Sequence, residues 1–594
     1  MLTIHEYREI LADVTLRAHG PFDDGYEVRD SDFHRTSKNA TINAVDSRPQ
    51  SKMCGILATS REIEDLQEVI EFLKRRGPDA TNHLQYRGIS FVHTLLSMTG
   101  KLTIQPFIDG ENDLVAFFNG EIYNYPDFGD YDSDGECIIP LYREHGDAFV
   151  PMLDGEFALA LFDFANDKMI VSTDIFSTKP LWMAIENGDF ALGSYESSIL
   201  RLGFENPIQI EANTTIIFSI SELKELERRP FWTFDLNQHK TDFDDWDAAF
   251  ENAIRKRTSG IKHGIFIGLS SGYDSGAIAC ELNRQNVPFT SYSIVGSEDP
   301  ETIKNRFELL ENTEYIELTR DRFLTARDHL KKFSEEYTLR IDNGEQALID
   351  GLEKQHQVVC AVLDELEPIY RELNDPEVTD EVRINRNNRA LLEKRMARYA
   401  EVVEYRKTGQ MLTDDNGAIG MSHICGVGRA RGELIYISGS GADEIFSDYG
   451  FQGIKHFRHS TIGGHFIEDI SKYFPWKNFF GNTQRAYLMK EEHVSGSHGV
   501  EGRYPFLDRE VVQEFLWLSA DLKNRFYKVP LHQYMAKHNF PFDICAKVGF
   551  NCGFSSSGED YIEKISTERT VGETKDESLI VDFGQWGEMN PISR

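Results

Sequence analysis

A run of apolar residues followed by a turn of small residues is the feature that most constrains the fold of this chain. Residues 263–282 read HGIFIGLSSGYDSGAIACEL. The apolar run predicts a buried strand, the Gly/Ser turn permits a tight bend, and the apolar spacing after it predicts a helix. A second strand and turn, GELIYISGSGADE, follow at 432–444. This order of elements predicts a parallel α/β domain whose turn can bind pyrophosphate through consecutive N–H groups.

The length of the chain predicts more than one domain. A sequence of 594 residues is too long for one ordinary core, so we expect two or three domains. Short strand-like runs with Gly, Asp and Asn turns fill the part before the α/β region, which predicts a β-rich domain with few helices. The expected boundaries are a polar extension or leader at 1–53, a β-rich domain at 54–225, an α/β domain at 243–565 with a charged helical insertion at about 320–410, and a polar tail at 566–594.

The charge balance limits the classes of partner. The chain has 63 Lys and Arg against 98 Asp and Glu, a formal net charge of −35. Such a surface repels phosphate backbones and anionic lipid, so we expect no nucleic acid and no membrane as partners. Any nucleotide site needs focused Lys, Mg²⁺ or backbone N–H groups. The 7 cysteines show no paired spacing, and no signal peptide or membrane-length apolar run is present, which predicts a cytoplasmic protein.

Four short motifs in the N-terminal part together suit attack on a primary amide. They are Cys54-Gly55, RRGPD at 75–79, FNGEIYN at 118–124 and DSDGE at 132–136. Each alone is more often structural, since buried cysteines are usually inert and an Asn-Gly pair usually marks a turn. Together they provide a thiol nucleophile, an amide and a Gly N–H for an oxyanion, and carboxylates for an ammonium group.

In this order the motifs resemble class II glutamine amidotransferases, a family with the αββα fold of N-terminal-nucleophile (Ntn) hydrolases. The resemblance implies that Cys54 is the catalytic nucleophile and that Asn119 and Gly120 form the oxyanion hole. Glutamine would be bound by Asn119, Gly120, Glu121, Asp134 and the backbone around Met98.

The family's catalytic cysteine is the first residue of the mature chain, where its own α-amine serves as the general base. Here Met53-Cys54 is internal. We therefore expect either translation from Met53 with loss of the methionine or cleavage after it. A free α-amine has an unperturbed pKa of about 8, close enough to neutrality for this role.

One position departs from the amidotransferase pattern. The family usually has an arginine that grips the glutamine α-carboxylate, and the matching position here is Leu95. An unpaired carboxylate in a closed pocket is costly, so another cation is needed, and Lys101 is the nearest candidate. Lost glutaminase activity is the alternative.

The turn LSSGYDS resembles the pyrophosphate loop of ATP pyrophosphatases that adenylate carboxylates. SGSGADEIFSDYG at 438–450, GVEGRYPFLD at 499–508 and RFYKVPL at 525–531 follow in the order found in asparagine synthetases. The chain is thus similar to the asparagine synthetase family from Cys54 to about Phe554. The implied roles are nucleotide binding by Leu269, Ser270, Gly272, Asp274, Ser275, Ile294, Ser438 and Gly439, metal binding by Asp274 and Asp443, and charge neutralisation on departing pyrophosphate by Lys528.

The resemblance implies a glutamine-hydrolysing carbon–nitrogen ligase that uses ATP and Mg²⁺. Ammonia from glutamine would attack an acyl-adenylate, releasing AMP and pyrophosphate. Its partners would be glutamine, ATP and a small carboxylate acceptor, and a homodimer is compatible with it. The family usually carries Glu where this chain has Ser440, so the acceptor is aspartate or another acid.

Two other readings stay open. An ATP-dependent ligase or cyclase could use an amine of its own substrate and keep a vestigial glutaminase domain. Leu95 and a blocked Cys54 favour it, whereas the intact Asn119–Glu121 segment and Asp134 disfavour it. A non-catalytic scaffold is the third, and Asp274, Asp443 and Lys528 together argue against it.

Overall fold

The structure is a computed structural model, and it describes the larger part of both predicted domains. The described residues are 54–337 and 412–542, apart from 75–76, 78–79, 96–97, 99, 102, 295, 297, 414 and 458. Between these two ranges, only 356, 360, 386 and 389–390 are described. The predicted N-terminal extension, most of the charged insertion and the tail therefore lie outside the described residues.

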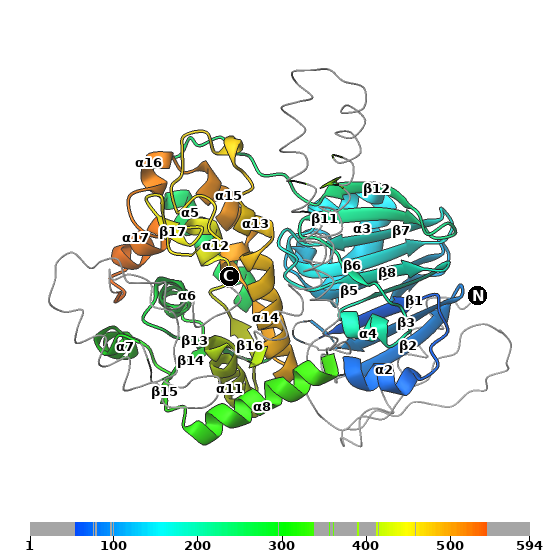
Figure 1. The fold of residues 1–594 in the computed structure, drawn as a ribbon, viewed down its shortest axis with the longest axis horizontal. Coiled ribbons are helices and arrows are strands. Elements are labelled where there is room, and N and C mark those ends of the chain that lie inside the picture. The colour runs from blue at the N-terminus through cyan, green and yellow to red at the C-terminus, as the bar shows by residue number, and fades with distance from the viewer. Residues whose placement is uncertain are drawn as a thin grey trace.

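The first half consists of two packed six-stranded antiparallel sheets (Figure 1). One sheet has the order β10-β8-β9-β1-β3-β2 and the other β12-β11-β7-β6-β5-β4. The first comprises β1 (Gly55–Thr59), β2 (Ala80–Tyr86), β3 (Ile89–Leu95), β8 (Trp182–Glu186), β9 (Asp189–Gly193) and β10 (Ile208–Gln209). The second comprises β4 (Phe107–Asp109), β5 (Leu114–Ile122), β6 (Gly155–Asp163), β7 (Lys168–Thr173), β11 (Thr214–Ser219) and β12 (Glu225–Pro230).

Alternation along the strands explains why the two sheets pack. Phe117 of β5 meets Phe91 of β3 edge to face between the sheets, with ring centroids 5.6 Å apart. Its neighbour Phe118 instead joins the core on the outer face, together with Ile138 of α3 (Ile138–His145). Helices α2 (Leu66–Leu73) and α4 (Glu196–Leu200) cover the other sheet. The predicted αββα layering is confirmed.

The second half contains the predicted parallel sheet. Its order is β15-β14-β13-β16-β19, and every neighbouring pair is parallel. The strands are β13 (Gly264–Gly268), β14 (Phe289–Ile294), β15 (Thr313–Ile316), β16 (Glu433–Ile437) and β19 (Glu501–Arg503). The chain leaves β13 toward β14 on one side and returns at β16 on the other, so the strand order reverses at β13. Open α/β sheets bind ligands at the carboxyl ends of the strands at such a point.

Helices surround this sheet on both faces (Figure 1). Helix α6 begins directly after the turn that follows β13, and α14 leads into β19. The helices of this half include α5 (Asp244–Thr258), α6 (Tyr273–Arg284), α7 (Pro300–Phe307), α11 (Asn416–Ala430), α12 (Ala442–Phe446), α13 (Lys477–Phe480), α14 (Thr483–His498), α15 (Arg509–Trp517), α16 (Ala520–Lys523) and α17 (Val529–Lys537).

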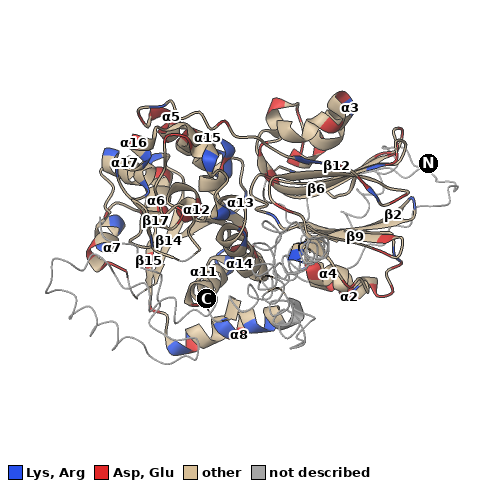
Figure 2. Cartoon of the chain, turned by 45° about the horizontal axis from the view of Figure 1, so that its top comes forward, with Lys and Arg blue, Asp and Glu red and all other residues tan. Residues whose placement is uncertain are grey.

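Helix α8 (Arg320–Tyr337) is the described beginning of the predicted insertion. It extends from the parallel-sheet half toward α4 of the first half (Figure 1), and Lys and Arg residues are distributed along it (Figure 2). Phe333 of α8 contacts Tyr195 beside α4, with ring centroids 6.4 Å apart. The insertion therefore starts as a helix that joins the two halves.

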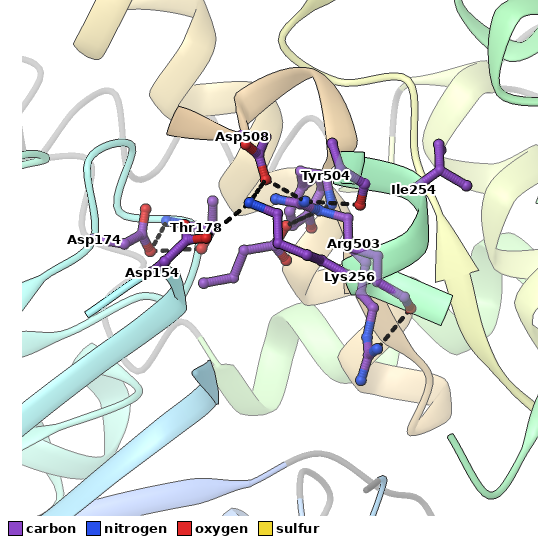
Figure 3. Close-up of polar contacts among 12 residues, drawn as sticks. Asp154, Asp174, Thr178, Ile254, Lys256, Arg503, Tyr504 and Asp508 are labelled. Carbon is purple, nitrogen blue, oxygen red and sulfur yellow. Dashed lines mark hydrogen bonds and ion pairs between the residues drawn. The ribbon is translucent and has the colours of Figure 1, made fainter. Parts of the chain in front are cut away.

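Buried ion pairs also join the halves (Figure 3). Lys256 of α5 contacts Asp154 and Asp508, each at 2.7 Å. The next residue, Arg257, contacts Glu156 of β6 at 2.7 Å and Asp508 at 2.8 Å. Burial alone would raise the pKa of the Asp508 carboxyl, but the two cations hold it well below its ordinary value. Breaking a buried pair typically costs about 3–5 kcal/mol, so these contacts fix how the halves meet.

Within the described ranges, no helix is long and apolar enough to cross a membrane.

Candidate active sites

The predicted nucleophile lies at the beginning of a central strand. Cys54 directly precedes β1, is half-buried and forms no disulfide. β1 pairs with β3 on one side and β9 on the other. Cys54 packs against the core cluster that contains Met98 and Phe118. Of the RRGPD motif, only Gly77 belongs to the described residues.

The predicted oxyanion-hole residues lie on β5. The Asn119 side chain is 2% exposed, and its amide nitrogen donates no hydrogen bond. A buried amide without a partner is uncommon, and it is suited to an oxygen that gains charge during a reaction. Gly120 has φ +128°, and a Cβ there would lie 1.9 Å from the carbonyl oxygen of Glu156, so no other residue fits. The strand thus holds an unsatisfied donor beside an obligatory glycine.

Two buried carboxylates lie next to this pair. Glu121 follows Gly120 on β5, and its Oε1 is 3.2 Å from Nη2 of Arg503. Asp134 accepts a hydrogen bond from the backbone N–H of Ile122 at 2.9 Å. Burial raises the pKa of Asp134 to about 6, although its backbone hydrogen bonds oppose the shift. The structure therefore brings the two predicted ammonium-binding carboxylates to one end of β5.

The position of the missing arginine and its proposed substitute, Lys101, lie in different surroundings. Leu95 is buried on β3, opposite Ala80. The Lys101 side chain is 75% exposed and pairs with Asp132 at 2.8 Å, so it lies at the surface. The buried cation beside Glu121 is Arg503, which sequence reasoning did not assign. In the sequence, Arg503 is part of the GVEGRYPFLD motif, and the motif alone does not indicate which domain the arginine faces.

The predicted pyrophosphate loop connects β13 to α6. Ser270 Oγ and Ser275 Oγ lie 2.8 Å apart, and the N–H of Gly272 donates to Ser270 Oγ at 3.2 Å. Gly272 is the N-terminal cap of α6 and provides no side-chain cap. The loop therefore curls around its two serines at the positive end of the helix, which favours an anion.

Two residues that sequence reasoning missed support the loop from outside. Arg306 of α7 is fully buried and donates to the carbonyl of Gly272 at 3.1 Å and to that of Ser270. Burial lowers the pKa of this guanidinium to about 10. Glu298 accepts a hydrogen bond from Ser271 Oγ at 2.7 Å. Neither residue lies in a recognisable motif, so only the structure reveals them.

Three predicted residues from distant segments meet at one ammonium group. Lys528 Nζ lies 2.6 Å from Asp274 Oδ1 and 2.7 Å from Asp443 Oδ1. Tyr527 also donates its hydroxyl to Asp443 at 2.9 Å. Burial disfavours the charge on Lys528, but the two carboxylates raise its pKa well above the ordinary value.

The remaining predicted nucleotide residues lie at the carboxyl ends of neighbouring strands. Leu269 donates its N–H to the carbonyl of Tyr292 at 2.8 Å, and Ile294 ends β14. Ser438 follows β16 and donates its N–H to the carbonyl of Arg503 at 2.9 Å. A Cβ on Gly439 would lie 2.8 Å from Cβ of Asp274, so the turns after β13 and β16 touch.

Comparisons with known proteins agree with this division. A glutamine amidotransferase domain model matches residues 53–231, and an asparagine synthase model matches residues 477–557. The chain is therefore a two-part enzyme, an amidotransferase domain joined to a synthase domain. It is similar to glutamine-hydrolysing asparagine synthetases over about three quarters of its length.

Two relatives illustrate the extent of the similarity. A probable glutamine-hydrolysing asparagine synthetase from Schizosaccharomyces pombe is 25% identical, over 79% of this chain and 77% of its own length. A putative one from Methanocaldococcus jannaschii is 25% identical, over 73% and 70%. Among solved structures, the B. subtilis glutamine phosphoribosylpyrophosphate amidotransferase matches 46% of this chain and 77% of its own, with 15% identity and a TM-score of 0.26.

Proposed function

We propose that this chain hydrolyses glutamine in its first domain and uses the ammonia in its second domain to amidate an ATP-activated carboxylate. The observation that best supports the second half is the meeting of Asp274, Asp443 and Lys528 beside the loop of α6. A group of charges from three distant segments has little structural reason to converge at a strand end. It suits a site where phosphates enter and leave.

In the first domain, the proposed nucleophile is the Cys54 thiolate. Asn119 and the Gly120 N–H stabilise the oxyanion that forms on the glutamine amide carbonyl. Glu121 and Asp134 hold the α-ammonium group, with the backbone at Met98 alongside. The unpaired Asn119 amide supports this scheme, and it disfavours a vestigial glutaminase domain, since an unused site has no need of a buried unsatisfied donor.

In the second domain, Ser270, Gly272 and Ser275 cradle the pyrophosphate of ATP. Leu269, Ile294, Ser438 and Gly439 border the nucleotide. Lys528 neutralises the charge that develops as pyrophosphate leaves.

Asp274 and Asp443 are the proposed Mg²⁺ ligands. Within the described ranges, no group of three or more metal-ligating side chains is present. Mg²⁺ usually binds through one or two carboxylates plus substrate phosphates, so this pair of aspartates fits. When bound, the ion would neutralise phosphate charge and orient the triphosphate.

The domain limits 54–225 and 243–565 and a cytoplasmic location form part of the proposal. The scattered cysteines suit a reducing compartment. The acceptor is a small carboxylic acid, with aspartate as the first compound to test.

The thiol needs a free α-amine, so the experiment begins with the mature N-terminus. Intact mass of the protein from its native host should show a chain that begins at Cys54. Cys54→Ala should then abolish amide formation from glutamine and leave amide formation from free ammonia unchanged. Cys280→Ala is the matched control, because burial raises the pKa of that thiol to about 12 and makes it inert. Loss of both activities in Cys54→Ala would contradict the division of labour.

A further inference from the structure

A cavity lies between three helices at the end of the parallel sheet that is opposite the proposed nucleotide site. Its volume is about 380 Å³, and it is lined by residues of α8 and α11 and by His498 at the end of α14. Helices α8 and α14 both pack on α11 (Figure 1). The cavity lies at the end of α11 that leads into β16, whereas the Ser438–Ser440 turn follows β16. This strand has 5 residues and rises about 3.3 Å per residue, so roughly 15 Å separates the cavity from that turn.

The size and the walls of the cavity suit a small molecule. Ligand sites usually occupy about 300–1,000 Å³ and combine apolar walls with a few polar groups. Here Ala326, Val427 and Ala430 provide apolar wall. Ala326 is buried and Ala430 is exposed, so the cavity opens to solvent between α8 and α11.

Gly426 of α11 keeps the cavity open. Glycine inside a helix is destabilising relative to alanine, so a glycine there needs a reason. A Cβ on Gly426 would lie 3.5 Å from Cε1 and 3.6 Å from Nδ1 of His498, and both distances are ordinary contacts. Close packing therefore does not require glycine at this position. A larger side chain would instead occupy the cavity and cover the Nδ1 edge of His498.

The titratable side chains that line the cavity are all basic. They are His329, His423, His498 and Arg431, and no Asp or Glu is among the described residues that line it. The chain has 98 Asp and Glu against 63 Lys and Arg, so a cavity lined only by basic groups stands out from the rest of it. Nη1 of Arg431 pairs with Glu314 at 2.6 Å, outside this lining. The lining favours an anionic ligand.

The imidazoles are held in fixed orientations. His329 stacks on His498 with ring centroids 4.0 Å apart. Nε2 of His329 is hydrogen-bonded to Ser497 Oγ at 3.0 Å, and Nε2 of His498 to Ser422 Oγ at 2.7 Å. Stacked rings do not aim their nitrogens at one point, and the described part of the chain contains no group of three side chains that could hold a metal ion. The cluster therefore suits an anion that accepts N–H hydrogen bonds.

The charges around the imidazoles link anion binding to proton uptake. Burial lowers the pKa of His423, and Arg322 of α8 adds to this effect. Burial also holds the pKa of His498 well below its ordinary value, and His329 and His423 lower it further. A carboxylate beside these rings would favour their charged form. Binding of an anion should therefore be accompanied by uptake of a proton.

We propose that this cavity is a binding site for a small carboxylate with a compact apolar body, separate from both active sites. The carboxylate accepts hydrogen bonds from the imidazoles of His423 and His498. The apolar body lies against Gly426, Val427 and Ala430.

A ligand at this site would contact the helix that joins the two halves. His329 and Phe333 are four residues apart on α8 and therefore lie on one face of it. Phe333 contacts Tyr195 of the first half and His493 of α14, with ring centroids 6.4 Å and 6.3 Å apart. The ligand thus lies about one helical turn from a contact between the halves, so its binding should slow amide hydrogen exchange in α8.

The test measures binding of phenylacetate to the full chain by ligand-observed NMR, with phenylacetamide as the uncharged counterpart. Phenylacetate should bind at least about tenfold more tightly, since hydrogen bonds to a charged acceptor are roughly twice as strong as neutral ones. Its affinity should rise between pH 8 and pH 6, where phenylacetate stays ionised and only the protein takes up a proton. Hydrogen exchange should slow in α8 and α11 and stay unchanged in the pyrophosphate loop. Binding requires neither glutamine nor ATP, so the result does not depend on the proposed function.

Gly426→Leu places a side chain in the volume that the ligand needs. It should weaken phenylacetate binding by at least about tenfold, because the leucine and the ligand cannot share that volume. Gly426→Ala is the matched control, since it adds one carbon and should retain binding. Both variants should resist denaturant at least as well as the wild type, because Ala and Leu favour helices more than Gly does.

His423→Gln tests the imidazoles without filling the cavity. It should weaken phenylacetate binding at pH 6 and flatten the dependence on pH. His465→Gln, which changes an exposed histidine outside the cavity, should behave as the wild type.

Several results would overturn the proposal. A wild type that binds neither compound has no ligand site in this cavity. Equal affinity for phenylacetate and phenylacetamide would exclude a site for carboxylates. Full binding by Gly426→Leu would place phenylacetate elsewhere on the chain, such as in the acceptor site. An affinity that stays constant between pH 8 and pH 6 would remove the imidazoles from the contact with the carboxylate.

Discussion

The two sites differ in how their polar groups are satisfied before any substrate binds. In the proposed glutamine site, the Asn119 amide nitrogen is buried without a hydrogen-bond partner. In the nucleotide site, Lys528 is bound by both Asp274 and Asp443. Under the proposed function, the first site receives a neutral carbonyl that becomes an anion, and the second is neutralised by its own charges until phosphates replace them.

This difference has a structural origin. The proposed oxyanion donors, Asn119 and Gly120, are consecutive on one strand that pairs along its whole length with β6. The charges of the proposed nucleotide site come from three separate segments, and the buried ammonium group of Lys528 depends on the two carboxylates for its charge partners. We therefore expect single substitutions to act locally in the first site and collectively in the second.

The strongest test of this contrast is Lys528→Met. Without the ammonium group, Asp274 and Asp443 face each other with no cation, and the charge on departing pyrophosphate is not neutralised. Removing a group that stabilises charge developing in the transition state typically reduces the rate by about 10²–10³-fold. Both glutamine-dependent and ammonia-dependent amide formation should fall by that factor, with glutamine hydrolysis retained.

Lys537→Met on the same helix provides the control. Its ammonium group is about half exposed and pairs with Asp247 at 2.7 Å, away from the proposed nucleotide site. This variant should keep full activity. Normal ammonia-dependent synthesis in Lys528→Met would remove Lys528 from the proposed chemistry.

A smaller and more selective loss is expected from Asn119→Ala. Deleting one oxyanion-hole donor typically reduces kcat by about 10²–10³-fold. The loss should appear in kcat for glutamine hydrolysis with little change in KM, because the donor strengthens only as charge develops on the carbonyl oxygen. Ammonia-dependent synthesis in the same protein is the internal control. An increase in KM alone would indicate that Asn119 binds glutamine without stabilising the oxyanion.

The same contrast explains what the sequence could and could not predict. The parallel sheet follows from the strand–turn–helix pattern, whereas the αββα layers and the grouping of Asp274, Asp443 and Lys528 were implied by the family resemblance that the ordered motifs carry. Chemistry that lies within one short segment, as at Asn119–Glu121, leaves a readable pattern.

Residues that act from another element left no such pattern. Arg306 donates to the backbone carbonyls of the pyrophosphate loop. Every loop sequence has backbone carbonyls, so this contact leaves no mark on the residue types of the loop. Arg503 reaches Glu121 across the domain interface. Glu491 of α14 accepts a hydrogen bond from Ser440, and the register of this helix with β16 depends on tertiary packing. The Lys101 hypothesis failed for a related reason, since closeness in sequence placed it near the pocket but packing left it exposed.

The smallest effect concerns pH and belongs to the first site alone. Since burial raises the pKa of Asp134 to about 6, this carboxyl is charged at pH 7 and neutral at pH 5. Only the charged form attracts the glutamine α-ammonium group, so the Kd for glutamine should rise by about tenfold between these pH values. Calorimetry on Cys54→Ala measures binding without hydrolysis. The variant Asp134→Asn should bind glutamine weakly at both pH values.

A raised folded-state pKa also means that the contribution of Asp134 to the free energy of unfolding is full below about pH 4 and is lost as pH rises through about 6. Denaturant melts of the ligand-free protein should show this decline in the wild type and a flatter profile in Asp134→Asn. A wild-type Kd that stays constant from pH 7 to pH 5 would remove Asp134 from the ammonium site and leave Glu121 to hold it.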